Sequence, residues 1–198
     1  AAAKTCQELE RLNIRTAEDY LQRFSGILNL TIVTLRGQLE EKLSLNQAVE
    51  RLIASLLENH RNGKKVMIIG NGGSAAIAIH MLVDYTNAGG LKTTDFCSPS
   101  MLTCMANDYG YENVFAGPVE LLADSGDLLF AISSSGKSPN IIKACEAADS
   151  RDCEVITFSG FDPDNPLRKA GQLNFYVPST HYGFVESAHQ ALLHCVLD

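Results

Sequence analysis

The chain has 198 residues, of which 45% are hydrophobic and 20% are charged, and its formal net charge is −7. These fractions are typical of a globular domain and exclude a disordered or collagen-like chain. The longest apolar runs, such as residues 128–132, have the length of a strand. They fall well short of the roughly 18 residues that span a bilayer.

Composition also indicates which partners and which cellular compartment to expect. The N-terminal residues 1–4 lead into polar sequence without a signal-peptide pattern. Lys and Arg form no cluster, so we expect no nucleic-acid partner. The cysteines form no C-x-x-C pair, and we expect free thiols in a reducing compartment: they are Cys6, Cys97, Cys104, Cys145, Cys153 and Cys195. We therefore expect a soluble cytoplasmic protein without a membrane partner.

The first 62 residues have helical patterns. Thr16 followed by acidic residues is typical of a helix start. An apolar stripe with spacings of three and four follows it: Leu21, Phe24, Leu28, Ile32 and Leu35. A second helix is expected from Ser44 to Asn62, with its own apolar stripe. The sequence thus predicts an N-terminal helical hairpin, and because its apolar stripes exceed what covers one sheet, we expect it to assemble a homo-oligomer.

From Lys65 onward, short apolar runs alternate with helical stretches, which predicts a parallel sheet covered on both faces. The expected strands are 66–69, 93–97, 128–132, 155–158 and 174–177. The expected helices lie near 75–87, 100–107, 115–123, 140–149 and 184–197. We expect a three-layer α/β/α fold in one domain over 1–198, with oligomerisation helices in 1–62 and the α/β core in 63–198.

A glycine-rich loop follows the first expected strand: Gly70, Asn71, Gly72, Gly73 and Ser74. Such a loop lets the backbone approach a ligand, and the helix that it opens offers free N–H groups to an anion. The pattern also matches a dinucleotide fingerprint with Asp95 as the ribose-binding acid, so a nucleotide-dependent oxidoreductase is one alternative.

A serine-rich loop follows the strand 128–132, with hydroxyls at Ser133, Ser134, Ser135 and Ser138. Gly136-Lys137-Ser138 is similar to the end of a P-loop, but the first glycine of that motif is replaced by Ala131. Hydroxyls and backbone amides at a helix N-terminus can bind a phosphate monoester. Two such loops on one sheet indicate a phosphorylated small molecule.

The order and spacing of these motifs resemble the sugar isomerase (SIS) domain family: Gly70–Ser74, His80, Asn107-Asp108-Tyr109-Gly110 and Ser133–Ser138. Within it, the chain is most similar to the phosphoheptose isomerases. The resemblance implies a five-stranded parallel flavodoxin-like sheet, a homotetramer assembled through the N-terminal helices, and no nucleotide cofactor. The implied reaction is an aldose–ketose isomerisation through an enediol. It converts sedoheptulose 7-phosphate to D-glycero-D-manno-heptose 7-phosphate, for nucleotide-activated heptose.

Two helices carry candidate chemical groups. His80 and Asp84 are spaced i, i+4 and share one helix face, and Glu186 and His194 share a face two turns apart. By themselves these residues fit a metal site or an acid/base pair.

The resemblance implies one zinc ion per subunit on His80, Asp84, Glu186 and His194, with Asp84 and His194 as the proton-transfer pair. The substrate-binding positions that we expect are Asn71, Gly72, Gly73, Ser74, Asp84, Asn107, Asp108, Ser133, Ser134, Ser135, Ser138 and Glu186.

Several positions depart from the family pattern. Asp84 stands where the family has Glu, and Glu186 stands where it has Gln. Ala88 and Gly183 replace an Arg and an Asp, and Lys137 adds a cation beside the serine loop. A second carboxylate strengthens the attraction for a divalent cation.

One further alternative is a non-catalytic SIS regulator that only binds a sugar phosphate. The family member that partners the replication initiator is of this kind, and it lacks a histidine at the position of His194. Because this chain has His194, we expect an enzyme.

Overall fold

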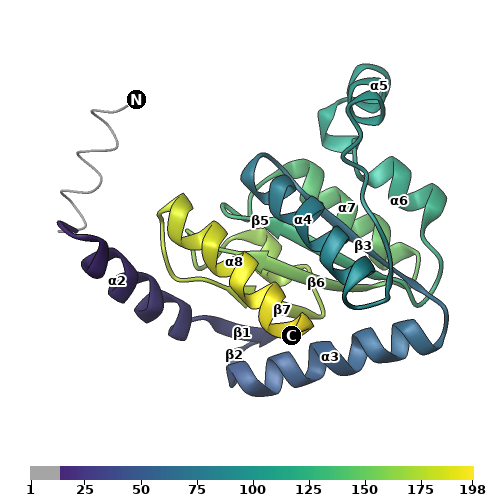
Figure 1. Ribbon diagram of the computed structural model, residues 1–198. Coiled ribbons are helices and arrows are strands. Elements are labelled where there is room, and N and C mark those ends of the chain that lie inside the picture. The colour runs from purple at the N-terminus through teal and green to yellow at the C-terminus, as the bar shows by residue number, and fades with distance from the viewer. Residues whose placement is uncertain (1–13) are drawn as a thin grey trace.

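Four apolar segments and one short polar segment form the parallel centre of the sheet in the computed structural model, which describes residues 14–198 (Figure 1). The strands are β3 (Lys65–Gly70), β4 (Lys92–Thr94), β5 (Leu128–Ser133), β6 (Glu154–Ser159) and β7 (Leu173–Tyr176). They lie in the order β4-β3-β5-β6-β7, and each neighbouring pair is parallel. This order confirms the flavodoxin-like sheet. Cys6 and the N-terminal segment 1–4 lie outside the described residues.

The helical hairpin predicted for residues 1–62 is wrong, because a β-hairpin separates the two helices. α2 (Ala17–Asn29) and α3 (Leu45–Arg61) flank β1 (Ile32–Leu35) and β2 (Gln38–Leu43). β1 pairs antiparallel with both β2 and β7, so the sheet has seven strands. The β-branched run 31–34 favours a strand over a helix, and Gly37, at φ 76°, makes the turn.

Capping groups define the starts of the two helices that flank this hairpin. Thr16 and Asp19 form a capping box at the start of α2, and Ser44 and Gln47 form another at the start of α3. Ile32 and Leu35, placed on the helical stripe by their spacing, belong to β1 instead.

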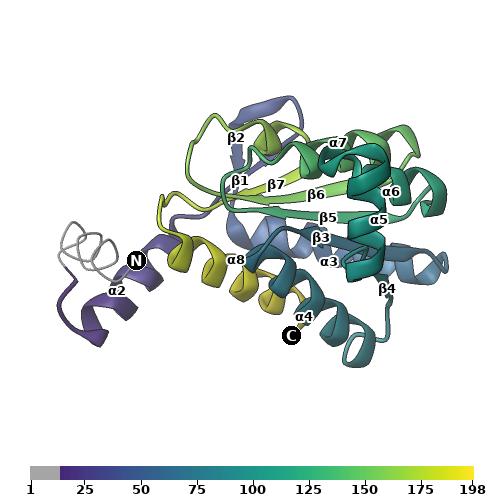
Figure 2. The ribbon, with the colours of Figure 1, turned by 90° about the horizontal axis from the view of Figure 1, so that it is seen from above.

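The remaining helices cover both faces of the sheet, as Figure 2 shows from above. They are α4 (Gly73–Asn87), α5 (Pro99–Tyr109), α6 (Ala116–Leu122), α7 (Pro139–Ser150) and α8 (Tyr182–Leu197), with short 3₁₀ turns η1 (Tyr111–Asn113) and η2 (Pro166–Lys169). Helices α3, α4 and α8 pack on one face against Val66 and Ile68, whereas α6 and α7 pack on the other against Met67 and Ile69. The alternation of these four side chains creates two separate cores.

The described residues contain five cysteines, all of them free thiols: Cys97, Cys104, Cys145, Cys153 and Cys195. Within residues 14–198, every helix is too short or too polar to cross a bilayer.

Candidate active site

The two loops meet because β3 and β5 are neighbours in the sheet and both end at the same edge. Together they line a pocket of about 250 Å³. Its lining comprises Asn71, Gly72, Gly73, Ser74, Ser133, Ser134, Ser135, Ser138, Tyr182 and Glu186. All residues expected from the two loops therefore lie around one cavity, which is called the loop pocket below.

Hydroxyl groups of the serine loop are turned toward one another and toward the loop backbone. Ser133 Oγ lies 3.3 Å from Ser138 Oγ and accepts a hydrogen bond from the Gly136 amide at 3.2 Å. Ser135 Oγ accepts from the Lys137 amide at 3.3 Å. Ser134 Oγ is buried and has no hydrogen-bond partner among residues 14–198. A buried hydroxyl without a partner costs free energy.

Lys137 does not extend into the loop pocket. Its Nζ donates to Asp162 Oδ2 at 2.7 Å on the exposed outer side of the loop, and this bond lowers the pKa of Asp162. The groups of the two loops that face the pocket are therefore hydroxyls, amides and helix N-termini, and Glu186 adds a carboxyl group from α8.

Close packing explains two glycines at this site. Gly136 adopts φ 62°, and a Cβ there would lie 2.0 Å from Asn165 Oδ1. A Cβ on Gly73 would lie 2.5 Å from Glu186 Oε2, so the Glu186 carboxyl lies against the first turn of α4. Burial raises the pKa of Glu186, whereas the helix N-terminus favours a negative charge there.

Next to the loop pocket, α4 and α8 bring together three possible metal ligands. His80, Asp84 and His194 have donor atoms that all lie within 4.8 Å of one another. Asp84 Oδ2 lies 3.1 Å from His80 Nε2 and 3.9 Å from His194 Nε2. The two imidazole rings meet edge to face, with centroids 5.4 Å apart.

Two nitrogen donors and one carboxylate fit a zinc ion, and three protein ligands leave the fourth position for water or substrate, as in catalytic sites. Glu186, expected as the fourth ligand, lies outside this group among the described residues. It instead joins the two parts of the site. A second pocket of about 430 Å³ contains both His80 and Glu186, and Glu186 also lines the loop pocket.

Asn107 and Asp108 are not brought to either pocket. Both are exposed near the end of α5, where the Asn107 side chain donates to Asp108 Oδ1 at 2.8 Å. α5 stands away from the sheet in Figure 1. Asp95 accepts from the Cys97 amide at 2.7 Å and caps its own loop. That local role and the flavodoxin-like strand order argue against the dinucleotide alternative.

The lining residues that sequence reasoning missed include Tyr182 and Gln190. Gln190 lies four residues after Glu186 and four before His194, so helical spacing places it on the same face. Tyr182 begins α8, and its place beside the serine loop depends on the tertiary packing.

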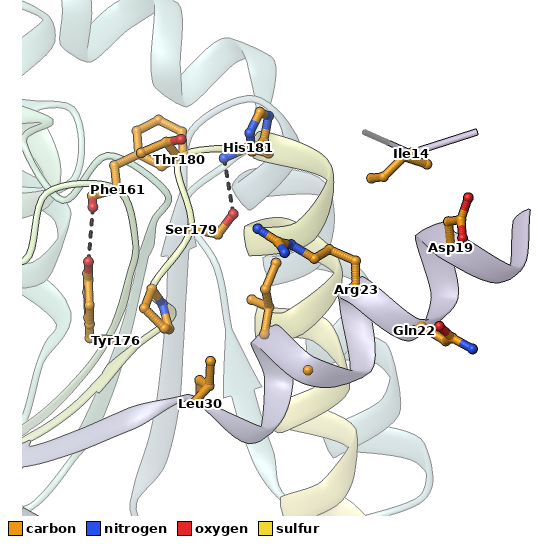
Figure 3. Close-up of a pocket in the computed structure, with 13 residues that line it drawn as sticks. Ile14, Asp19, Gln22, Arg23, Leu30, Phe161, Tyr176, Ser179, Thr180 and His181 are labelled. Carbon is orange, nitrogen blue, oxygen red and sulfur yellow. Dashed lines mark hydrogen bonds between the residues drawn. The ribbon is translucent and has the colours of Figure 1, made fainter. Parts of the chain in front are cut away.

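A larger pocket, of about 890 Å³, lies elsewhere (Figure 3). Arg23 of α2 and Leu30, just after that helix, line one side, and Ser179, Thr180 and His181 line the other. None of the residues expected at the active site lines it. Size therefore does not identify the site, whereas the clustered histidines and serines do.

The fold and the two loops are those of a sugar-phosphate-binding α/β domain, and a family model described as a SIS domain matches residues 31–160. The chain therefore belongs to the SIS-domain family. Within this family it is similar to phosphoheptose isomerases.

Curated relatives and solved structures agree on that similarity. The chain is 36% identical over 163 residues to the phosphoheptose isomerase of Shewanella frigidimarina, covering 78% of this chain and 81% of that protein. It is 36% identical over 164 residues to that of Helicobacter hepaticus, covering 78% and 82%. A phosphoheptose isomerase structure from Neisseria gonorrhoeae has 34% identity and a TM-score of 0.71, covering 78% of this chain and 86% of that one.

Proposed function

We propose that the protein is a phosphoheptose isomerase, which converts sedoheptulose 7-phosphate to D-glycero-D-manno-heptose 7-phosphate. The observation that carries this proposal is the adjacency of the loop pocket to the His80, Asp84 and His194 cluster, through the shared lining residue Glu186. One end binds a phosphate, and the other supplies groups that move protons. The similarity to phosphoheptose isomerases supports the choice of sugar.

At the phosphate end, the hydroxyls of Ser133, Ser134, Ser135 and Ser138 and the first turns of α4 and α7 hold the phosphate oxygens. At the other end, Asp84 and His194 form the proton-transfer pair. One removes the proton next to the carbonyl, and the other handles the proton on the carbonyl oxygen. His80 lies 3.1 Å from Asp84 and holds that carboxylate in place.

Zinc fits the donor set of His80, Asp84 and His194 and would polarise the substrate carbonyl when bound. Glu186 contributes its carboxylate from the wall between the two pockets. We also propose a single SIS domain over residues 1–198 and a cytoplasmic homotetramer. The free cysteines of the described residues support the reducing compartment.

The first prediction tests the reaction. Wild-type protein with zinc added, incubated with sedoheptulose 7-phosphate, is expected to form an aldoheptose 7-phosphate detectable by NMR. Asp84→Asn and His194→Gln are each expected to lower kcat by about 100- to 10,000-fold, the usual cost of a lost acid or base. Binding of the sugar phosphate, measured by calorimetry, should change much less.

Binding without turnover of any sugar phosphate would contradict the enzyme and favour the regulator. Turnover of a different sugar phosphate would contradict only the choice of substrate, and would direct attention to Glu186, Ala88 and Gly183.

A further inference from the structure

A reciprocal pair of amides links the two loops of the active site. Asn71 Nδ2 donates to Asn140 Oδ1 at 2.9 Å, and Asn140 Nδ2 donates to Asn71 Oδ1 at 2.9 Å. Asn71 belongs to the glycine loop, and Asn140 lies in the first turn of α7, just after the serine loop. Asn71 lines the loop pocket, whereas Asn140 is buried, with 1% of its surface exposed, and lies behind it.

The backbone fixes which way both amides face. The Ile141 amide donates to both the Ser138 carbonyl and Asn140 Oδ1, each at 3.1 Å, so exchanging that oxygen with the nitrogen would lose one of the two bonds. Asn140 Oδ1 then requires a donor, which is Asn71 Nδ2, and Asn140 Nδ2 requires an acceptor, which is Asn71 Oδ1. The orientation of Asn71 therefore follows from one backbone N–H on α7.

A third segment completes the arrangement. Tyr111 Oη donates to Asn71 Oδ1 at 3.0 Å from the turn η1, forty residues farther along the chain. Tyr111 directly follows Asn107-Asp108-Tyr109-Gly110, the motif whose polar side chains do not reach either pocket. The segment that follows this motif thus contacts the site through the Tyr111 hydroxyl.

Hydrogen-bond capacity shows what Asn71 can offer a ligand. Its oxygen already accepts two hydrogen bonds, from Asn140 and from Tyr111, which uses both lone pairs. Its nitrogen donates one hydrogen to Asn140 and keeps one. The Asn71 side chain is therefore left as a donor only, which suits phosphate or hydroxyl oxygens.

We propose that Asn140 and Tyr111 are positioning residues that hold Asn71 as a donor toward the sugar phosphate and fix the spacing of the two loops. Neither touches the substrate itself. The proposal rests on the proposed function for the identity of the ligand, and it extends the site to the α5–η1 segment.

A double-mutant cycle tests the route through Asn71. Tyr111→Phe removes one hydroxyl from a side chain that is 57% exposed, so the fold should be unaffected. We expect it to raise the Kd for sedoheptulose 7-phosphate by about 3- to 10-fold, the usual range for one hydrogen bond. KM should rise by the same factor, with kcat within twofold. In the Asn71→Ala background, Tyr111→Phe should have no effect on Kd.

Asn140→Ala is measured in the same two backgrounds. It will lower the melting temperature in both, but it should weaken binding only where Asn71 is present. Tyr109→Phe is the matched control, because Tyr109 is 63% exposed and its hydroxyl makes no hydrogen bond within residues 14–198. It should leave Kd, KM and kcat unchanged.

Equal effects of Tyr111→Phe with and without Asn71 would overturn the proposal, as would equal binding losses for Asn140→Ala in both backgrounds. Coupled effects on Kd without turnover by the wild type would contradict the proposed isomerase and keep the positioning roles. If the wild type does not bind sedoheptulose 7-phosphate, both proposals are overturned.

Discussion

Ser134 lines the loop pocket, and its hydroxyl is buried without a partner among residues 14–198. The neighbouring hydroxyls of Ser133 and Ser138 are close enough to bind the same group. Hydrogen bonds to a charged phosphate are worth about twice those to a neutral oxygen. The serine loop should therefore discriminate phosphorylated from unphosphorylated sugars.

Replacing Ser135 and Ser138 together with alanine tests that discrimination. We expect the double variant to bind sedoheptulose 7-phosphate at least ~100-fold more weakly, because two hydrogen bonds to a charged group are lost. Binding of sedoheptulose without phosphate should hardly change. Calorimetry on both ligands measures this, and an equal loss for both would contradict the assignment.

The spacing of residues along the sequence was enough to predict most of the individual residues of the candidate site. The i, i+4 pair His80 and Asp84 and the hydroxyls of the serine loop follow from strand, loop and helix patterns that are contiguous in sequence. The contact between Tyr111 and Asn71 joins residues forty positions apart, and no periodicity indicates it. Asn107 and Asp108 were expected by resemblance alone, and the described structure leaves them exposed.

At the scale of elements, α8 carries Glu186 and His194 and is held against β6 by a buried histidine. His189 Nε2 lies 3.1 Å from the Ser159 carbonyl oxygen, with its ring fully buried against Phe158. His189 Nδ1 has no partner within residues 14–198. Burial lowers the pKa of His189 from 6.5 to about 4, so the ring is neutral in the folded protein at neutral pH.

This histidine predicts a loss of stability in acid. Between pH 6.5 and 4 the unfolded chain binds a proton that the folded protein does not, so stability falls as the pH falls through that window. At pH 5 we expect this group to cost about 2 kcal/mol relative to pH 7. Urea unfolding at both pH values measures this. The free energy of unfolding should fall between pH 7 and pH 5 by about 2 kcal/mol less in His189→Gln than in the wild type.

The exposed His60 gives a matched control for this prediction. His60→Gln should keep the wild-type difference in the free energy of unfolding between pH 7 and pH 5. If His189→Gln behaves in the same way as His60→Gln, the buried ring is not the cause of acid sensitivity.

The misassigned hairpin shows where sequence patterns are ambiguous. Leu21, Phe24 and Leu28 do lie on α2, but spacings of four and three continue by coincidence to Ile32 and Leu35 in β1. A strand of four residues is too short to show a clear alternation of apolar and polar side chains. Two local signals mark the break, namely Gly37 with positive φ and the capping box at Ser44.

For the whole molecule, α2 is one of the least covered helices, together with α5, which buries no residue. α2 stands apart from the sheet in Figures 1 and 2 and buries only Ile27 among its residues. Leu21, in its second turn, is 62% exposed, and Leu30, which follows its last residue, is 65% exposed. Exposed leucines on a helix of this kind favour contact with another copy of the chain.

Light scattering at micromolar concentration tests the predicted homotetramer. We expect a mass four times the 21.5 kDa of one chain. Leu21→Glu should lower that mass, because it places a charge on the proposed contact, whereas Leu121→Glu on α6, at a leucine that is even more exposed (81% against 62%), should not. A wild-type monomer would contradict the assembly.

The antiparallel hairpin at the end of the sheet also has a consequence for aggregation. Without it, β7 would present an unpaired backbone edge, which is a template for strands of other chains. β1 and β2 cover that edge, and the new outer strand carries the exposed charges of Glu41 and Lys42. At the opposite edge, β4 is only three residues long. Neither edge of the sheet is therefore a good template for cross-β growth. The chain can thus expose apolar helices for assembly at high concentration without its strands joining into fibres.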